Sequence, residues 1–287
     1  MWQLIGESPV LFISLTFALS LLVGSFLNVV IYRVPKMMKN AWEAEIKEYQ
    51  GAVPEEKAPF NLITPASTCP ACGHKIRAWE NIPVVSWLVL GGKCSACKTP
   101  ISIRYPIIET LTAVLSAFAA WHLGFSAYTL AFIVGTWLLV AMTFIDIDEM
   151  LLPDTLTLSL LWLGLLVTAW FYPENLTSAV LGAAFGYLSL FSVYWGFKLL
   201  TGKEGMGFGD FKLLAALGVW VGWQQLVVII LLSSVVGAIV GILLMLKRNE
   251  NGSMAIPFGP YLAAAGYLTV LFGNEIVDWY LTSFVSY

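Results

Sequence analysis

The chain has 287 residues, of which 59% are hydrophobic and only 11% are charged, and its mean hydropathy is +0.80. Soluble globular domains carry about 25% charged residues, so this composition excludes an ordinary water-soluble enzyme and indicates a lipid-facing surface. It also excludes disorder, because so apolar a chain has ample surface to bury. The net charge is −3, and without a basic excess we expect no nucleic-acid partner.

Long apolar runs separated by short polar breaks follow one another along the chain. Because a helix needs roughly 20 apolar residues to cross a bilayer, the pattern predicts an all-α polytopic membrane protein with about eight transmembrane helices. The expected runs cover residues 9–32, 105–121, 128–145, 155–172, 177–197, 211–222, 225–246 and 256–272. The sixth run is about 18 Å long as a helix, so we expect it to be tilted, only partly embedded, or continued past its C-terminal break.

The basic residues predict the orientation in the membrane. Ten of the 15 lysines and arginines lie in residues 33–104, and the others follow the apolar runs in 198–212 and 247–248. No basic residue precedes the first run, whereas Arg33 and Lys36 follow it, so we expect an anchor and not a cleaved signal peptide. The positive-inside rule then places the N-terminus outside and residues 33–104 in the cytoplasm.

Three parts are expected on this basis: a first transmembrane helix in 1–32, a cytoplasmic domain in 33–104, and a transmembrane bundle in 105–287. The cytoplasmic part is too small to build much core unaided, so it should need a covalent or metal link. The glycines at 182, 186, 237 and 241 have the small-xxx-small spacing of helix packing faces.

All four cysteines stand in two Cys-x-x-Cys pairs, Cys69 with Cys72 and Cys94 with Cys97. Two such pairs can complete the tetrahedral shell of a structural Zn²⁺ site, which predicts a small zinc-ribbon-like domain after the first helix. Two disulfides are the alternative, which the reducing cytoplasm disfavours. His74 is an alternative ligand to one cysteine. A shell of four thiolates has no open position, so we expect the metal to be structural.

Ionisable residues at the edge of an apolar bundle are candidates for function, because burying them is costly. Asp146 ends the third run, where the helix dipole disfavours a carboxylate, so a structural role for it is hard to find. Asp154 follows Pro153 and precedes the next run, which fits either a helix N-cap or a site residue. Asp148 and Glu149 are expected to form a solvated turn.

A second cluster contains Asp210, which follows three alternating glycines and opens the sixth run. Glycines at 205, 207 and 209 permit a positive φ or a close approach to another segment. The alternative is a helix N-cap after a flexible linker. A phosphate-binding loop fits poorly, because the Gly-Lys-Ser/Thr ending is missing.

Asp146 and Asp210 both lie at cytoplasmic ends of expected helices and can converge, although 64 residues separate them. Two carboxylates in a partly desolvated site share one proton, so that one activates water while the other polarises a peptide carbonyl. This is aspartic-protease chemistry. The only histidines are His74 and His122, which leaves a Ser-His or Cys-His mechanism without an obvious base.

Motifs over nearly the whole chain resemble those of the bacterial type IV prepilin peptidases, a Gly-x-Gly-Asp class of intramembrane aspartic proteases. They are Gly24-Ser25-Phe26-Leu27-Asn28-Val29-Val30, the tetracysteine segment with Asn81-Ile82-Pro83 and Ser86-Trp87, Ile103-Arg104-Tyr105-Pro106 with Glu109, Asp146 with Leu152-Pro153-Asp154, Gly207-Phe208-Gly209-Asp210-Phe211-Lys212, and Pro257-Phe258-Gly259-Pro260-Tyr261. No motif position departs from the family pattern.

The resemblance implies an inner-membrane enzyme with Asp146 and Asp210 as its catalytic pair, and with Asp154, Gly207, Gly209 and Lys212 as supporting candidates. Its substrates would be prepilins and pilin-like subunits of type II secretion systems, cut after a glycine at the cytoplasmic membrane face. The tetracysteine domain would mark the bifunctional members, which also methylate the new N-terminus with S-adenosylmethionine.

The residues themselves support the peptidase better than the methyltransferase, because no Gly-x-Gly-x-x-Gly cofactor loop follows a strand. Asn28 and Glu109 could orient substrate or equally satisfy an interhelical hydrogen bond. Two other functions stay open as alternatives. One is a proton or metal transporter, which should show carboxylates at the bilayer midplane and two related halves. The other is a non-catalytic membrane scaffold with a zinc ribbon.

Overall fold

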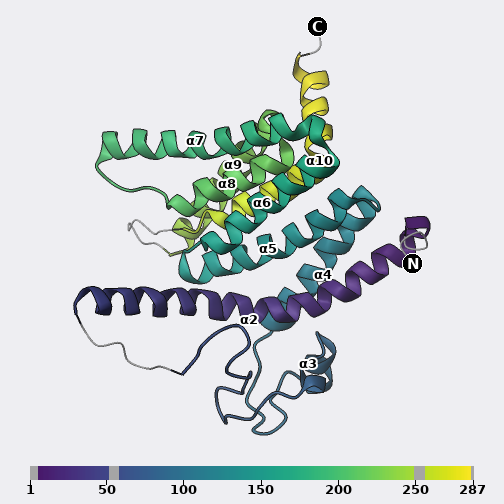
Figure 1. Cartoon of the computed structure of the whole chain (residues 1–287), viewed down its shortest axis with the longest axis vertical. Helices are drawn as coiled ribbons and strands as arrows, with labels where there is room; N and C mark the ends of the chain where they lie inside the picture. Colours follow the sequence, from purple (N-terminus) through teal and green to yellow (C-terminus); the bar gives the residue numbers. More distant parts are fainter. Residues whose placement is uncertain (1–5, 52–57, 249–255, 286–287) are drawn as a thin grey trace. The chain divides into compact units, whose positions relative to one another are not determined.

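The computed structural model describes residues 6–51, 58–248 and 256–285, which fold almost entirely into helices (Figure 1). The described residues contain no β-strand and only two isolated β-bridges. The chain divides into two compact units, residues 1–121 and 122–287.

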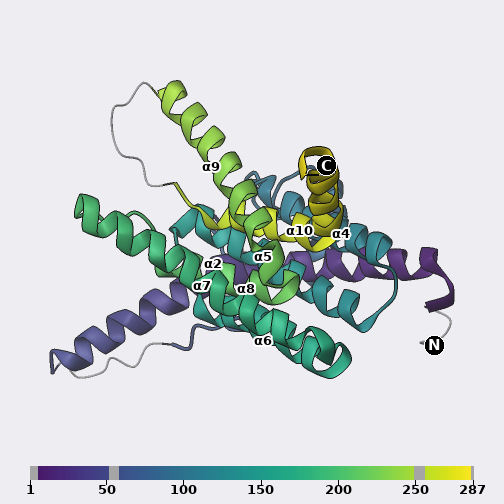
Figure 2. The ribbon, with the colours of Figure 1, turned by 90° about the horizontal axis from the view of Figure 1, so that it is seen from above.

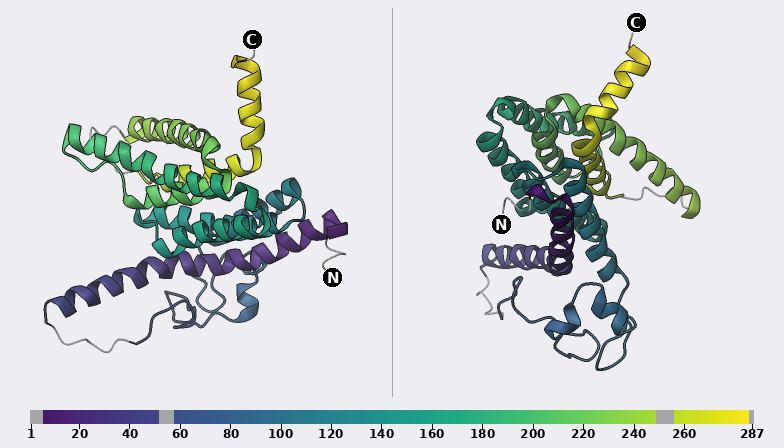
Figure 3. Two further views of the ribbon diagram at one scale, coloured as in Figure 1. Left: turned by 45° about the horizontal axis from the view of Figure 1, so that its top comes forward. Right: turned by 90° about the vertical axis from the view of Figure 1, so that its right-hand side faces the viewer.

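The first unit is built on two long helices, α2 (Pro9–Tyr49) and α4 (Arg104–Leu123). Between them lie the 3₁₀ turn η1 (Ala78–Asn81) and the short helix α3 (Val85–Val89). α2 begins at Ser8, whose side chain accepts from the Leu11 N–H, with Pro9 in the first turn. It runs on well past the apolar residues 9–32 as one continuous helix (Figure 3).

α2 and α4 approach each other closely at Gly24. A Cβ on Gly24 would lie 2.7 Å from the Cα of Glu109, so only glycine fits at this crossing. Four residues along α2, the side-chain amide of Asn28 donates to the Gly24 carbonyl at 3.2 Å and to the Tyr105 carbonyl at 3.4 Å. Asn28 therefore makes the interhelical hydrogen bond that the sequence allowed for.

In the second unit the described residues form six longer helices, one of which, α8, is buried among its neighbours (Figures 1 and 2). They are α5 (Ala127–Glu149), α6 (Asp154–Phe171), α7 (Leu176–Thr201), α8 (Phe208–Val221), α9 (Leu226–Arg248) and α10 (Gly259–Tyr280). α8 packs against α6, α7 and α10 and is buried from Phe211 to Trp220 with few interruptions. From Leu213 to Trp220 it is apolar throughout, because its neighbours bury every side chain of this stretch.

Glycines let the backbones of α7 and α8 touch. A Cβ on Gly182 would collide with the carbonyl oxygen of Gly218, and a Cβ on Gly218 would collide with that of Gly182. One turn along α7, a Cβ on Gly186 would lie 2.6 Å from the Leu214 carbonyl oxygen. The predicted packing role of Gly182 and Gly186 is confirmed.

Six of the described helices are long and apolar enough to cross a membrane: α2, α4, α5, α6, α7 and α9. The prediction of an all-helical, multi-pass membrane protein is therefore confirmed. The two other expected runs correspond to α8 and α10, which are not among these six. α8 has only 14 residues, so it is a buried core helix of its unit.

Candidate active site and metal centre

Asp146 lies in the last turn of α5, and its side chain is buried, with 5% of the residue exposed. The helix ends at Met150, which has a left-handed backbone with φ of 50°. The Asp146 carboxylate accepts a hydrogen bond from the backbone N–H of Gly259, with 2.9 Å between N and Oδ2. It therefore satisfies one of the free N–H groups at the start of α10.

This contact corrects one argument from the sequence, which found no structural role for Asp146. The carboxylate is at the unfavourable end of α5 but also at the favourable, positive end of α10. The absence of a side chain on Gly259, the first residue of α10, makes this possible, because a Cβ there would lie 2.7 Å from Oδ2 of Asp146. Asp146 thus has a structural partner, while its burial at the end of the bundle keeps it a candidate site residue.

Asp210 lies in the first turn of α8 and is 8% exposed. Gly207 precedes the helix as its N-cap and has an extended backbone with φ of −82°. The positive φ that the sequence allowed for is therefore not used at Gly207. Close approach is what the next glycine provides: a Cβ on Gly209 would lie 2.8 Å from the Cβ of Leu152. The Gly-x-Gly-Asp segment is thus packed against the loop that follows α5.

The fold brings Asp146 and Asp210 together. Asp210 lies close enough to Asp146 for the charge of one carboxylate to act on the other. Leu152 joins the two sides, because it contacts Gly209 and its Cδ2 also lies 3.2 Å from where a Cβ on Gly259 would stand. The result is a buried pair of carboxylates at one end of the bundle, between the end of α5 and the starts of α8 and α10.

Asp154 and Lys212 form an ion pair beside this site. The Lys212 ammonium lies 2.7 Å from both carboxylate oxygens of Asp154, and both side chains are partly solvent-exposed. Asp154 is the first residue of α6, and its side chain makes no capping hydrogen bond, since Pro153 takes the cap position. The pair therefore ties the start of α6 to the second turn of α8.

The four cysteines form a second candidate site in the other unit. Their Sγ atoms all lie within 4.8 Å of one another, and those of Cys69 and Cys97 are 3.7 Å apart. A tetrahedral shell with Zn–S bonds of about 2.3 Å separates its sulfurs by roughly 3.8 Å. No disulfide joins the four thiols, and the donor set fits a metal ion bound by sulfur.

The two cysteine pairs sit on turns with the same backbone pattern. An antiparallel bridge closes each turn, Thr68 with Lys75 and Lys93 with Pro100. In each turn the first cysteine donates its N–H to the carbonyl five residues on, at 2.9 Å, and a residue with positive φ follows the second cysteine. That residue is Gly73 in the first turn and Lys98 in the second.

His74 braces the two turns and is not part of the sulfur cluster. Its Nε2 lies 3.2 Å from the Glu80 carboxylate and 3.3 Å from the Ser95 hydroxyl of the second turn. The pKa of Glu80 is lowered to about 2, mainly by the hydrogen bond from the Arg77 backbone N–H and secondly by one from the Ser95 hydroxyl. These contacts outside the sulfur cluster hold the two cysteine turns against each other. The spacing of the cysteines in the sequence did not predict them.

Glu109 is buried in α4, and its carboxylate accepts from the Val84 backbone N–H at 2.7 Å. Val84 has a left-handed backbone with φ of 61°, rare for a β-branched residue. Arg33 is also buried and donates to the carbonyls of Asn61 and Pro65 at 2.8 and 2.7 Å. Both charged groups hold loops onto the long helices of the first unit.

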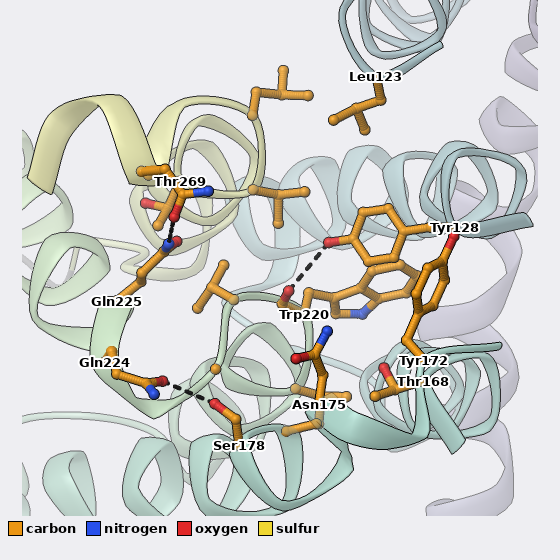
Figure 4. Close-up of a pocket in the computed structure, with 18 of the residues that line it drawn as sticks. Leu123, Tyr128, Thr168, Tyr172, Asn175, Ser178, Trp220, Gln224, Gln225 and Thr269 are labelled. Carbon is orange, nitrogen blue, oxygen red and sulfur yellow. Dashed lines mark hydrogen bonds between the residues drawn. The ribbon is translucent and has the colours of Figure 1, made fainter. Parts of the chain in front are cut away.

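A cavity of about 780 Å³ lies in the second unit, at the opposite end of α5 and α8 from the carboxylate pair. Figure 4 shows its polar lining, with the Tyr128 hydroxyl donating to the Trp220 carbonyl at 3.1 Å and Ser178 donating to Gln224 at 2.8 Å. Tyr128 is in the first turn of α5 and Asp146 in the last, roughly 27 Å along the helix axis. This cavity is therefore separate from the carboxylate pair.

Fold and site together define a multi-pass helical membrane protein with a buried carboxylate pair in one unit and a tetracysteine cluster in the other. Residues 18–123 match the model of the bacterial peptidase A24 N-terminal domain, and residues 133–242 match that of the type IV leader peptidase family. The chain belongs to the type IV leader peptidase family.

Curated relatives support the same assignment. A prepilin leader peptidase/N-methyltransferase of Pseudomonas aeruginosa is 55% identical over 278 residues, and one of Aeromonas hydrophila is 56% identical over 279, each covering 96% of both chains. A protein of the same name from Legionella pneumophila is 44% identical over 263 residues, 91% of this chain and 92% of its own. No solved structure gives a significant match to this chain.

Proposed function

We propose that this chain is a membrane aspartic endopeptidase that removes the leader peptide of type IV prepilins and pilin-like type II secretion subunits, and then methylates the new N-terminus. One observation carries the peptidase half. Two buried carboxylates, Asp146 and Asp210, come together at the end of a helical bundle although 64 residues separate them, and Leu152 packs against both Gly209 and Gly259 beside them.

Such a pair does not ionise twice easily, so it holds one proton between two oxygens. The ionised carboxylate takes a proton from a water molecule, whose oxygen attacks the carbonyl carbon of the scissile peptide. The protonated carboxylate donates to the carbonyl oxygen, and the tetrahedral intermediate collapses as the amide nitrogen takes a proton and leaves. The hydrogen bond from the Gly259 N–H holds one oxygen of Asp146 and leaves the other for this exchange.

The supporting residues position this pair. Gly209 lets the start of α8 lie against Leu152, so that Asp210 reaches the end of α5. Gly207 caps α8, and its carbonyl accepts from the Asp210 N–H at 3.3 Å. The Asp154–Lys212 ion pair holds α6 and α8 together on the outer side of the same site. We assign positioning roles, and not proton transfer, to these four.

The site is proposed to face the cytoplasm across the inner membrane, because of the distribution of lysine and arginine. A prepilin is a membrane-inserted helix preceded by a short basic leader, so the peptide bond at that junction lies at the membrane boundary. Asp146 in the last turn of α5 and Asp210 in the first turn of α8 are at a helix end, as such a substrate requires.

Cys69, Cys72, Cys94 and Cys97 are proposed to bind a structural Zn²⁺. The metal would join the two turns of a segment that has no strand or long helix of its own in residues 58–103, and four thiolates leave no position for substrate. Its contribution is to the folding of this domain and not to the hydrolytic step.

S-adenosylmethionine is the proposed methyl donor, on the strength of the relatives' names and the retained tetracysteine segment. The described residues contain no strand–glycine loop–helix unit that would cradle it, so we assign no residue to the methyl transfer.

The test is cleavage of a model prepilin by the purified protein in detergent, with mass analysis of the mature N-terminus. Wild type should release the leader peptide, and addition of S-adenosylmethionine should increase the product mass by one methyl group. Asp146→Asn and Asp210→Asn should each abolish cutting while the protein stays folded and metal-loaded. Normal cutting by both variants would overturn the peptidase mechanism and favour a transport function.

A further inference from the structure

An apolar groove of about 460 Å³ lies in the first unit, between α3 and the start of α4. Trp87 and Leu88 line it from α3, while Ile103, Ile107, Leu111 and Val114 line it from α4 and the residue before it. Among the lining residues, only Thr110 has a side-chain hydroxyl, and none has a charged side chain. The other polar group is the indole N–H of Trp87, which already donates to the Ile101 carbonyl at 3.1 Å. The groove is thus built for an apolar occupant.

The groove continues the membrane-facing side of a spanning helix. Ile107, Leu111 and Val114 follow at helical spacing along one face of α4 and are exposed, and α4 is one of the six helices apolar enough to cross the membrane. From Ile103 to Val114 the groove is roughly 16 Å long, about half of a hydrocarbon core of about 30 Å. That length corresponds to one leaflet.

The helix α3 closes the groove and also exposes large apolar side chains. Leu88 is 64% and Val89 75% exposed, which is unusual for a helix in a polar domain. Trp79 and Tyr105, about half-exposed, lie before and after it, and such aromatic residues are enriched at the level of lipid headgroups. This surface therefore has the composition of a membrane interface.

The net charge of the segment that contains α3 favours an anionic occupant. Residues 58–104 carry five lysines and arginines, Lys75, Arg77, Lys93, Lys98 and Arg104, against the single carboxylate of Glu80. A zinc tetrathiolate would add two negative charges and leave the segment positive. Lys93 is held next to α3, because the Ile101 N–H donates to the Gly92 carbonyl at 2.7 Å, and Gly92 packs on Trp87.

We infer that α3 lies in the lipid interface and that the groove binds an acyl chain of an anionic phospholipid, with its headgroup near Lys93 and Lys98. The tetracysteine segment between α2 and α4 is then a membrane-bound platform, attached to lipid by α3 as well as by its two long helices. Neither the peptidase chemistry nor the metal requires this contact.

The test places the photoreactive residue p-benzoylphenylalanine at position 88 of the full chain, reconstituted in vesicles of phosphatidylethanolamine with phosphatidylglycerol. After irradiation, the mass of the labelled protein identifies what occupied the groove. A matched variant carries the probe at position 63, since Ile63 is even more exposed than Leu88, 86% against 64%, but lies in a loop outside the groove. We expect phospholipid adducts at position 88 and none at position 63.

A second variant tests the charge. With the probe at position 88, Lys93→Glu combined with Lys98→Glu should lower the share of phosphatidylglycerol among the adducts to its share in the vesicles. Metal content, measured alongside, reports that the tetracysteine segment is folded, and prepilin cleavage reports the same for the second unit. Equal labelling at positions 63 and 88, or no lipid adduct at 88, would overturn the inference. So would adducts at 88 with a second copy of the chain, or with an added prepilin peptide in place of lipid.

Discussion

The Asp146 carboxylate accepts a hydrogen bond from the Gly259 backbone N–H at 2.9 Å, across 113 residues of sequence. This contact joins the last turn of α5 to the first turn of α10. It also holds one oxygen of a carboxylate that we propose as catalytic, so that the same carboxylate serves both folding and chemistry. The two roles can be separated by substitution.

Asp146→Asn should lose activity but keep the fold. Asparagine still offers an oxygen to the Gly259 N–H, so we expect a melting temperature within a few degrees of wild type in detergent. Asp146→Ala leaves that buried N–H without a partner and should cost about 1–3 kcal/mol in the free energy of unfolding. If both variants were equally stable, the hydrogen bond would not contribute to the fold.

Gly259→Ala should disturb the site through sterics alone. The new Cβ would lie 2.7 Å from Oδ2 of Asp146 and 3.2 Å from Cδ2 of Leu152, so the carboxylate must move. We expect a loss of prepilin cleavage on the order of 100-fold in a protein that still folds. Gly196→Ala in α7 is the matched control, because nothing lies within 4 Å of its Cβ position, and it should cut normally.

Lys98→Gly should stabilise the second cysteine turn. Lys98 has a φ of 62°, a conformation that costs a side-chain-bearing residue about 1 kcal/mol or more, and Gly73 takes the corresponding place in the first turn. We expect slower metal loss to a chelator and a higher melting temperature for Lys98→Gly, and the reverse for Gly73→Ala. Equal metal-loss rates in all three proteins would contradict the strain at Lys98.

Removing the ion pair between Asp154 and Lys212 should have small effects. Both groups are partly exposed, so Asp154→Ala should cost less than about 1 kcal/mol in stability. We expect its cleavage rate to stay measurable, to equal that of Lys212→Ala, and to fall no further in the double variant. A complete loss of cleavage in Asp154→Ala alone would assign Asp154 a direct part in the reaction.

The sequence predicted the features that are encoded locally. Apolar runs located the eight longer helices of the described residues, because lipid and core burial both require continuous apolar segments. Two Cys-x-x-Cys pairs predicted a sulfur cluster, because the ligand spacing is itself the motif. Hydropathy did not reveal that α2 continues to Tyr49, since residues 33–49 are polar while still favouring a helix.

The individual contacts between distant segments could not be predicted from the sequence. The pairing of Asp146 with Gly259, and the position of Leu152 against both Gly209 and Gly259, depend on how three helix ends pack. The partners of His74 likewise come from Glu80 and from Ser95 in the other turn. These contacts are known only from the fold, because no local sequence motif marks the residues that make them.

The central claim is that Asp146 and Asp210 act as one catalytic unit, and a double-mutant cycle tests it most directly. Cleavage of a model prepilin should be measured for wild type, Asp146→Asn, Asp210→Asn and the double variant, each checked for fold and metal content. Residues that act as a unit are strongly non-additive, so we predict the same residual rate in all three variants. Losses that multiply in the double variant, or a single variant that cuts normally, would contradict the account.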